Sequence, residues 1–315
     1  MSLHTAAHDT ALPALPRLTT TVPKEYVHRA SLAEVFLTGC TAQGNDQFSL
    51  TGQWPRTHAL FNSPDGKSHD PLQVAETFRQ AGMFLAHAEL GVPLGQRFIM
   101  WNLTYTTNPH HLTITNHPTD FDLHAHCTDI TRRRGTATRM HMQLTIHRAG
   151  HLLAHGNGTF SAIPPAVYQR LRNHHTPPTT PYNPTTHRNP LPPTTIGRTT
   201  TTDVLLTPTT TPHRYLLTPD HNHPILFDHT DDHLPGMVLL QAARQAANTT
   251  TPHTLTPTHA TTHFHHYSEH NQPTYIDITH TTTHPNNTTT IHITGHQNNN
   301  TIFNTTINGP INTPT

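Results

Sequence analysis

The sequence predicts an α+β protein made of two copies of one unit, each a curved antiparallel sheet wrapped around one central helix. The first observation is an internal repeat: residues 76–81 read ETFRQA, and residues 241–246, 165 positions later, read QAARQA. Both hexads lie in helical contexts behind loops rich in His and Asp, which favours duplication over chance. The second observation is that about four segments of strand character follow each helix. A chain of 315 residues is long enough for two such units.

The first central helix is predicted over residues 70–90, because apolar residues recur there at the spacing of a buried helical stripe. These residues are Val74, Ala75, Phe78, Ala81, Gly82 and Leu85. Asp70 is expected to cap the helix, and Pro71 suits its first turn. Gly91 and Pro93 are expected to end it.

The second central helix is expected to run from Pro235 to about Ala247, behind Asp231 and Asp232. The predicted strands share a high content of β-branched and aromatic residues, and Thr supplies much of it in the second half. In the first half they are Phe98–Tyr105, Phe121–Asp129, Arg139–Arg148 and Leu152–Ser161. In the second half they are Thr262–Ser268, Thr274–Thr279, Thr289–Thr294 and Thr301–Ile307.

This pattern divides the chain into four stretches. Residues 1–21 lack the pattern of a secretory signal and are expected to form a disordered leader. Residues 22–165 and 203–312 are the two units, of which the second has the poorer composition. Residues 166–202 are expected to form an extended linker, because prolines are too dense after residue 168 for a helix.

The composition disfavours several classes of protein. Lys and Arg total 18 and balance 18 Asp and Glu, and no cation follows Arg244, so we expect no binding to nucleic acid. No apolar run approaches the roughly 18 residues of a membrane helix, so we expect no membrane span. Cys40 and Cys127 are too few for a disulfide framework and fit a reducing cytoplasm.

The 33 His and 29 Pro residues, with much Thr, Asn and Gln, exceed ordinary usage. These five amino acids share codons that begin with two letters drawn from A and C, so mutational drift of the gene would enrich them together. A histidine-rich metal buffer is the alternative, but metal-binding tracts cluster His with acidic or Cys partners. The histidines here are scattered among Thr and Pro, so we expect neither a metal nor another cofactor.

Several short motifs point to one family. In the first half they are VPKEYVHR at 22–29, AEVFLTG at 33–39, QWPR at 53–56, HDPL at 69–72, RQAG at 79–82 and FIMW at 98–101. In the second half they are HPILFDH at 223–229 and DHLPGMVLL at 232–240. Together they resemble the AfsA family of streptomycete γ-butyrolactone biosynthesis proteins. The stretch PGMVLLQ at 235–241 also resembles the helix start of hotdog-fold dehydratases, which implies a tandem (double) hotdog and a thioester substrate.

The AfsA resemblance implies an acyltransferase. A β-ketoacyl group would move from an acyl-carrier-protein or acyl-CoA thioester to a hydroxyl of dihydroxyacetone phosphate. The ester would then close to a butenolide phosphate, a precursor of an A-factor-type γ-butyrolactone that controls antibiotic production. This chemistry needs a base, donors for an oxyanion and a cation for the phosphate. The chain would act as a monomer with an internal duplication, or as a dimer.

Glu76 is the predicted base, because burial in an apolar helix would raise the pKa of its carboxyl group. Arg79 and Arg244 each lie three residues after the first position of a hexad and are expected to bind the phosphate. Arg244 is the stronger candidate, because Arg79 has Glu76 as a salt-bridge partner. Gln241 stands where family members typically have Glu, and since an amide cannot act as a base, Gln241 is expected to orient the substrate.

Four further candidates precede the two helices. His69 and His233 are expected to take part in catalysis, and Asp70 and Asp232 to orient the substrate, with helix capping as the alternative for both Asp residues. Backbone N–H groups near Gly236 are expected to form the oxyanion hole.

Two other functions stay open, and a third is disfavoured. The repeat alone also allows a hotdog dehydratase or thioesterase that acts on a carrier-bound acyl group. The amide at Gln241 is also consistent with a catalytically inactive homologue, which would bind acyl chains or a partner protein. A DNA-binding regulator is disfavoured, because no helix-turn-helix or basic face is evident.

Overall fold

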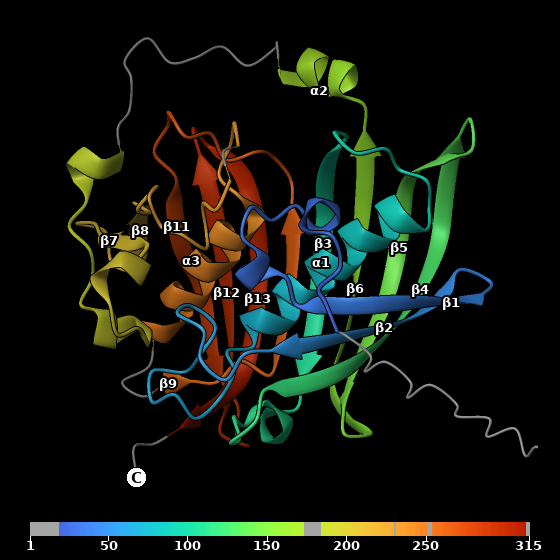
Figure 1. Cartoon of the computed structure of the whole chain (residues 1–315). Coiled ribbons are helices and arrows are strands. Elements are labelled where there is room, and N and C mark those ends of the chain that lie inside the picture. The colour runs from blue at the N-terminus through green and yellow to red at the C-terminus, as the bar shows by residue number, and fades with distance from the viewer. Residues whose placement is uncertain (1–18, 173–183, 230, 251–253, 313–315) are drawn as a thin grey trace, which may run out of the picture.

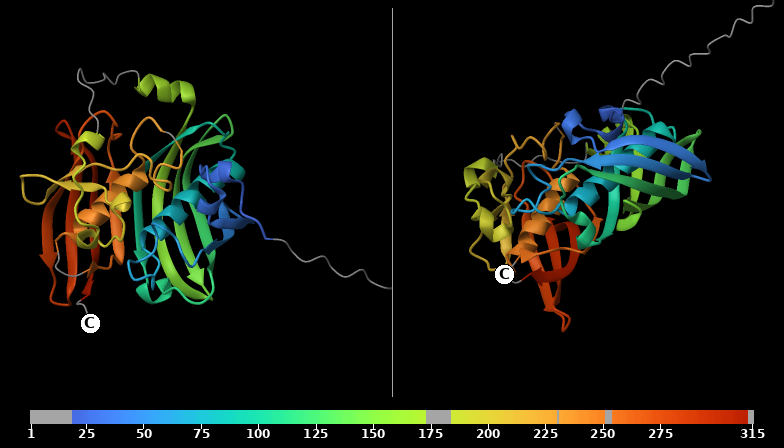
Figure 2. Two further views of the ribbon diagram at one scale, coloured as in Figure 1. Left: turned by 60° about the vertical axis from the view of Figure 1, so that its left-hand side comes forward. Right: turned by 60° about the horizontal axis from the view of Figure 1, so that its bottom comes forward.

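The computed structural model of the chain describes residues 19–172, 184–229, 231–250 and 254–312. Two helices, α1 (Leu72–Ala88) and α3 (Gly236–Asn248), lie on one face of a single curved sheet (Figure 1). Helix α1 covers the strands of the first half and α3 those of the second, and the sheet curves around both (Figure 2). This is the duplicated α+β architecture that the repeat predicts. Most of the predicted leader, residues 1–21, lies outside the described residues.

The sheet has the strand order β1-β2-β4-β5-β6-β3-β10-β13-β12-β11-β8-β7, with β9 paired to β13. The first half contributes β1 (Leu37–Gly44), β2 (Gln47–Trp54), β3 (Arg97–Thr107), β4 (Thr119–Arg133), β5 (Thr136–Arg148) and β6 (His151–Ile163). The second half contributes β7 (Leu206–Pro208), β8 (Arg214–Leu217), β9 (Thr254–Leu255), β10 (His259–Phe264), β11 (Tyr275–Thr283), β12 (Thr288–Gln297) and β13 (Asn300–Asn312).

Each of the eight predicted strands overlaps an observed one, but two edge hairpins were not predicted. The segments of β1–β2 and β7–β8 are rich in Gly, Thr and Pro and carry few of the β-branched apolar residues that mark a strand. The turn between β1 and β2 has left-handed φ at Asn45 (52°) and Asp46 (55°), the type I′ geometry that suits these residues. The strand expected over 262–268 ends at Phe264, where the chain leaves the sheet.

Strands β3 and β10 join the two halves into one sheet. They pair antiparallel, with His259 opposite Thr106 and His263 opposite Asn102. The duplicated chain therefore forms within one molecule the continuous sheet that two separate units would form on pairing.

Helix α1 is buried on its polar as well as its apolar side. Its apolar stripe packs on the sheet, where Gly156 of β6 leaves room for the ring of Phe78. A Cβ at Gly156 would lie 2.1 Å from the carbonyl oxygen of Thr104 and 2.6 Å from the Phe78 ring, so only glycine permits this approach. The polar residues Gln73 and Glu76 are also fully buried, and they lead to the site described below.

The predicted linker, residues 166–202, needs two corrections. Helix α2 (Pro165–Arg172) forms at its start, because Pro165 is tolerated in a first turn and the next proline comes only at residue 177. Two 3₁₀ turns, η5 (Pro193–Ile196) and η6 (Thr201–Asp203), then bury Ile196 and Arg198, so the second unit begins before residue 203. Residues 173–183 of this stretch lie outside the described residues.

None of the helices in the described ranges combines the length and the apolar character that crossing a bilayer requires.

Candidate active site

The two units begin with the same local structure. In the first, the 3₁₀ turn η1 (Lys24–Val27) leads into His28, at a φ of 54°, and then Arg29. In the second, η5 leads into Gly197, at a φ of 67°, and then Arg198. Both positions are in the left-handed region, which turns the chain so that the following arginine enters the interior.

A histidine holds the loop that follows in each unit. His58 Nε2 lies 3.2 Å from a carboxylate oxygen of Glu34, while its Nδ1 accepts two backbone N–H groups. His223 makes the same contacts, with Asp203 at 3.0 Å. The two units therefore place their loops, turns and helices in the same relation, and their residues can be compared one by one.

Glu76 is the centre of a closed ionic cluster in the first unit. Its carboxylate is 0% exposed and accepts hydrogen bonds from Arg29 Nε at 3.1 Å, Arg79 Nη2 at 2.7 Å and Gln80 Nε2 at 2.8 Å. Arg79 Nε also donates to the second carboxylate oxygen at 2.8 Å. Arg29 makes a further ion pair of 3.2 Å with Asp228 of the second unit. Two guanidinium groups and two carboxylates balance here.

The predicted rise in the pKa of Glu76 is therefore wrong. Burial alone would raise it, but Arg29, Arg79 and Gln80 outweigh burial and hold the pKa at about 2. A carboxylate that is so strongly stabilised is a weak proton acceptor, so this geometry does not favour Glu76 as the base. The guanidinium group of Arg79 is likewise paired with Glu76 and is not available to bind a phosphate.

The equivalent cluster of the second unit carries a net positive charge. Arg198 Nη2 lies 3.1 Å from Asp70 Oδ2, and Arg244 Nη2 lies 3.9 Å from the same oxygen. Gln241 occupies the place of Glu76 and brings no charge. Two buried guanidinium groups thus share one carboxylate, Asp70, which also accepts the Leu72 N–H at the start of α1, as the capping prediction requires.

The pKa values of the equivalent arginines reflect this difference. Burial lowers the pKa of Arg29, but Glu76 and Asp228 more than offset it, so that it is raised. Burial also lowers the pKa of Arg198, and there Asp70 and Asp203 do not compensate, because Arg244 adds a second positive charge.

Unpaired polar atoms are frequent among the residues of the second cluster and at the start of α1. In the described part of the chain, fourteen buried side-chain nitrogen and oxygen atoms have no hydrogen-bond partner, and eight of them belong to five residues. These residues are His69 (Nδ1), Gln73 (both amide atoms), Arg198 (Nε), Gln241 (both amide atoms) and Arg244 (Nε and Nη1). Each such atom costs about 1–3 kcal/mol when left without a partner. A polar, anionic ligand would satisfy the unpaired donors of Arg198 and Arg244.

His69 precedes Asp70 at the start of α1. Its ring is 1% exposed, and Nε2 lies 2.9 Å from the hydroxyl of Thr119. Burial, with Arg148 nearby, lowers the pKa of His69 to about 4. The imidazole is therefore neutral at pH 7, and with Nε2–H donating to Thr119 its free Nδ1 is a proton acceptor.

Asp232 and His233 make their contacts elsewhere. The hydroxyl of Tyr168 in α2 donates to Asp232, Arg172 pairs with the same carboxylate at 3.1 Å, and His233 Nδ1 lies 2.9 Å from it. These contacts hold α2 against the second unit, and none of them reaches Arg244. Asp231, Asp232 and His233 also bring three potential metal ligands within 4.8 Å of one another, although the Asp232 carboxylate is already held by α2.

Gly236 begins helix α3. In the described structure neither its N–H nor that of Met237 has a hydrogen-bond partner, so both remain available as donors at the positive end of the helix.

The sequence interpretation missed Arg29 and Arg198. Their signal is a second repeat, in which residues 22–38 align with 191–207 at an offset of 169 positions instead of 165. The second unit is four residues shorter between this turn and its histidine, because the hairpin β7–β8 is shorter than β1–β2. A search at one fixed offset therefore does not detect it.

Comparison with known proteins decides the family. The profile of the A-factor biosynthesis hotdog domain (AfsA) matches residues 10–164 and 180–311. The chain belongs to the AfsA family.

Curated AfsA-family relatives cover most of the chain. A 2-oxo-3-(phosphooxy)propyl 3-oxoalkanoate synthase of Streptomyces virginiae is 42% identical over 260 residues, which are 82% of this chain and 87% of that protein. A synthase of the same name from Streptomyces coelicolor is 36% identical over 303 residues, 96% of this chain and 93% of that protein. The predicted AfsA resemblance is thereby confirmed.

The solved structures confirm the hotdog fold. A putative oleoyl thioesterase from Lactobacillus plantarum superposes with a TM-score of 0.52 at 9% sequence identity, covering 86% of this chain and 98% of that one. This AfsA-family chain is therefore a tandem hotdog in which the two central helices are α1 and α3.

Proposed function

We propose that this chain catalyses the reaction for which its relatives are named, the formation of a 2-oxo-3-(phosphooxy)propyl 3-oxoalkanoate. The product is an ester between a β-keto acid and a phosphorylated three-carbon ketone. The acceptor is dihydroxyacetone phosphate, and the acyl donor is a thioester of an acyl carrier protein or of coenzyme A. The observation that carries this proposal is the buried pair Arg198 and Arg244, which share one carboxylate and leave three guanidinium nitrogens without a hydrogen-bond partner.

Arg244 binds the phosphate of the acceptor. Its Nε and Nη1 have no partner in the described structure, and its one ion pair, with Asp70, is long at 3.9 Å. A guanidinium group with free donors suits a phosphate, to which it donates charge-assisted hydrogen bonds. Arg79, at the equivalent place in α1, cannot bind a phosphate in this way, because its Nε and Nη2 already donate to the carboxylate of Glu76.

His69 accepts the proton of the attacking hydroxyl. The hydroxyl oxygen forms a bond to the thioester carbonyl carbon, the C–S bond breaks, and the thiolate takes up the proton that His69 had received. The unpaired Nδ1 of the neutral imidazole supports this role, whereas the Glu76 carboxylate is occupied by hydrogen bonds from Arg29, Arg79 and Gln80.

Gln241 orients the acyl group. Its amide N–H can donate to the carbonyl oxygen as negative charge develops there, which a carboxylate at this position could not do. The free N–H groups of Gly236 and Met237 provide further donors for the oxyanion. The absence of an acidic group at 241 is then compatible with activity, since the base comes from His69.

Mass spectrometry of a mixture of the protein, a β-ketoacyl thioester and dihydroxyacetone phosphate tests the proposal. We expect the phosphorylated ester or its butenolide. Arg244→Gln should raise the KM for dihydroxyacetone phosphate by about tenfold or more, the size of a lost charge-assisted hydrogen bond. His69→Asn should lower kcat by about 100-fold or more, as expected for loss of a general base.

Arg79→Gln is the matched control, because it makes the same chemical change at the equivalent place in the first unit. It should lower stability and leave the KM for dihydroxyacetone phosphate near that of the wild type. Intact thioester binding without any product would contradict the transfer reaction and favour an inactive acyl-binding homologue.

A further inference from the structure

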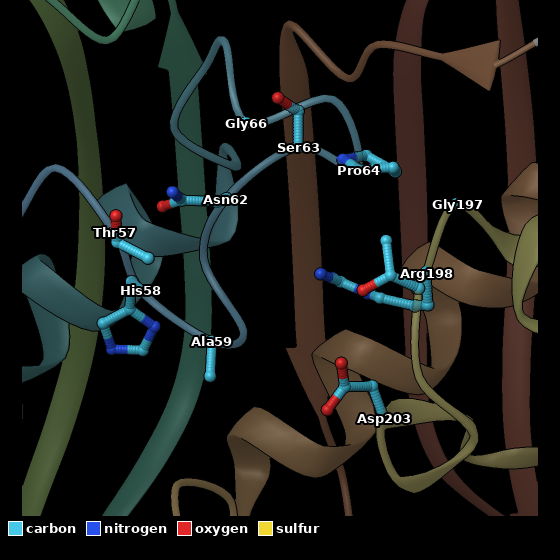
Figure 3. Close-up of a pocket in the computed structure, with 11 residues that line it drawn as sticks. Thr57, His58, Ala59, Asn62, Ser63, Pro64, Gly66, Gly197, Arg198 and Asp203 are labelled. Carbon is cyan, nitrogen blue, oxygen red and sulfur yellow. The ribbon is translucent and has the colours of Figure 1, made fainter.

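A cleft opens at the boundary between the two units, directly outside the second cluster. Its volume is about 190 Å³. One wall is the loop from Thr57 to Gly66 of the first unit, and the other is the segment from Gly197 to Asp203 of the second (Figure 3). Liquid water occupies about 30 Å³ per molecule, so the space exceeds that of a few waters.

Arg198 connects this cleft to the interior. Its side chain points from its own segment toward the opposite loop, where Nη1 donates to the carbonyl of Leu60 at 2.6 Å (Figure 3). On its inner side, Nη2 pairs with Asp70, whose same oxygen faces Arg244. Arg198 is 5% exposed and its Nε has no partner, so a buried cation with one free donor lines the cleft, together with the carboxylate of Asp203, which is paired with His223.

The corresponding place in the first unit is sealed by a carboxylate. Asp228 accepts the backbone N–H of Ala30 at 3.0 Å and pairs with Arg29 at 3.2 Å, and its side chain is 3% exposed. At the offset of 165 that relates His58 to His223, the residue equivalent to Asp228 is Ser63. Ser63 lines the cleft. Its hydroxyl donates a hydrogen bond to the carboxylate of Asp65 and accepts one from the N–H of Ser68.

We infer that this cleft is the entrance for the phosphorylated acceptor and that Arg198 is a second phosphate ligand, which works together with Arg244 behind it. The inference rests on the proposed function, to which it adds the path by which the acceptor enters and Arg198 as a further phosphate ligand. The phosphate would take a place between the two guanidinium groups that share Asp70. The first unit, in which Glu76 and Asp228 neutralise Arg29 and Arg79, binds no phosphate, so each chain takes up one acceptor.

Calorimetric titration of the full chain with dihydroxyacetone phosphate, and separately with inorganic phosphate, tests this without any acyl donor. We expect one site per chain. Ser63→Asp places a carboxylate where Asp228 stands in the other unit, and it should weaken binding by about tenfold or more through repulsion of the dianion and closure of the cleft. Asp228→Ser is the reciprocal control and should not weaken binding at the cleft, because Asp228 does not line it.

A second pair of variants covers the case in which Ser63→Asp fails to fold. Thr199 and Ala30 are equivalent, and both are exposed. Thr199→Glu puts a negative charge at the cleft and should weaken binding, whereas Ala30→Glu should not. Arg198→Lys should also weaken binding, because lysine cannot offer two donors in one plane.

The outcomes separate this inference from the proposed function. Wild-type phosphate affinity in Ser63→Asp and Thr199→Glu, or two sites per chain, would overturn the inference even if the enzyme forms product. Phosphate binding with the expected variant pattern, in a protein that forms no ester from a β-ketoacyl thioester, would uphold the inference and refute the acyl transfer.

Discussion

At position 76 a carboxylate and at position 241 an amide occupy equivalent places on the two central helices. The carboxylate of Glu76 joins Arg29 and Arg79 into a neutral cluster with Asp228. The amide of Gln241 leaves the corresponding arginines with one carboxylate between them. A difference of one ionisable group therefore separates a structural cluster from a site that can bind an anion.

Glu76→Gln is expected to destabilise the protein by about 3–5 kcal/mol, because it leaves two buried guanidinium groups without their main counter-ion. Urea unfolding would measure this loss, and kcat per folded molecule should stay near the wild-type value. Gln241→Glu is the reciprocal change and should increase stability, since it adds a carboxylate to a cluster of net positive charge. A stable but inactive Glu76→Gln protein would instead restore Glu76 as the base.

Buried histidines predict how stability depends on pH. The pKa of His28 is lowered to about 3 and that of His69 to about 4, in both cases mainly by burial. The unfolded chain, with pKa values near 6.5, binds more protons than the folded one below that pH. The free energy of unfolding should therefore be highest above pH 6.5 and fall toward pH 4, by about 1.4 kcal/mol per pH unit for each histidine.

Unfolding by urea at several pH values between 7 and 4 would measure this slope. His28→Gly is the matched variant, because Gly197 stands at the equivalent left-handed position of the second unit. It should flatten the slope without abolishing it, since His69 remains. An unchanged slope would show that His28 is not held neutral by the fold.

Among the elements, the second-half strands show how a segment rich in threonine forms a core. Thr262 of β10 and Thr305 of β13 are register partners in the interior, and their hydroxyl groups hydrogen-bond at 2.7 Å. Thr207 and Thr218 form a similar buried pair at 2.8 Å. The β-branched stem packs like that of valine, while the paired hydroxyl groups satisfy each other.

This pairing predicts an asymmetry between two single substitutions. Thr305→Val leaves the Thr262 hydroxyl buried without a partner and should cost about 1–3 kcal/mol. Thr262→Val should cost less, because the Thr305 hydroxyl still donates to the carbonyl of Thr261 at 3.1 Å. The double variant should be more stable than Thr305→Val alone when the three proteins are unfolded in urea. Equal losses in both single variants would contradict this account of the hydroxyl pair.

Across the whole molecule, the two units are tied by the β3–β10 seam and by two arginines that cross it. Arg29 donates to the carbonyl of Ile225 at 2.9 Å, and Arg198 donates to that of Leu60 at 2.6 Å. Each unit thus completes the interior of the other.

A chain divided between residues 178 and 179 should therefore reassemble when its two parts are produced together. Copurification through a tag on one part would detect the complex. Each part alone should be insoluble or unfolded, because it exposes the seam strand and an unpaired buried arginine. Two stable, non-interacting monomers would contradict this view of the interface.

The architecture was predictable from the sequence because it depends on periodic patterns. The apolar stripe of α1, the hexad repeat and the eight strands are local signals, and the structure contains each of them. Arg244 and His69, predicted as site residues from position in a motif, both have buried polar atoms without a hydrogen-bond partner, and their roles remain predictions.

The properties of the site depend on contacts between distant parts of the chain, which local patterns do not contain. The pKa of Glu76 is set by Arg29, 47 residues away, and the charge around Arg244 is set by Arg198, from a stretch interpreted as a linker. Asp232 and His233 share their motif with Gly236, yet their partners lie on α2. Only the folded chain shows that Glu76 and Arg79 on α1 pair with each other, while Gln241 and two nitrogens of Arg244 on α3 have no hydrogen-bond partner.

The continuous seam between the units has a consequence for how this protein can change over time. In a homodimer of single hotdog units, one gene specifies both sites, so every substitution appears twice. With both units in one chain, a mutation alters one site and spares its counterpart. Selection could then keep a glutamate and a sealing aspartate on one side for stability, while the other side kept its arginines free for a substrate.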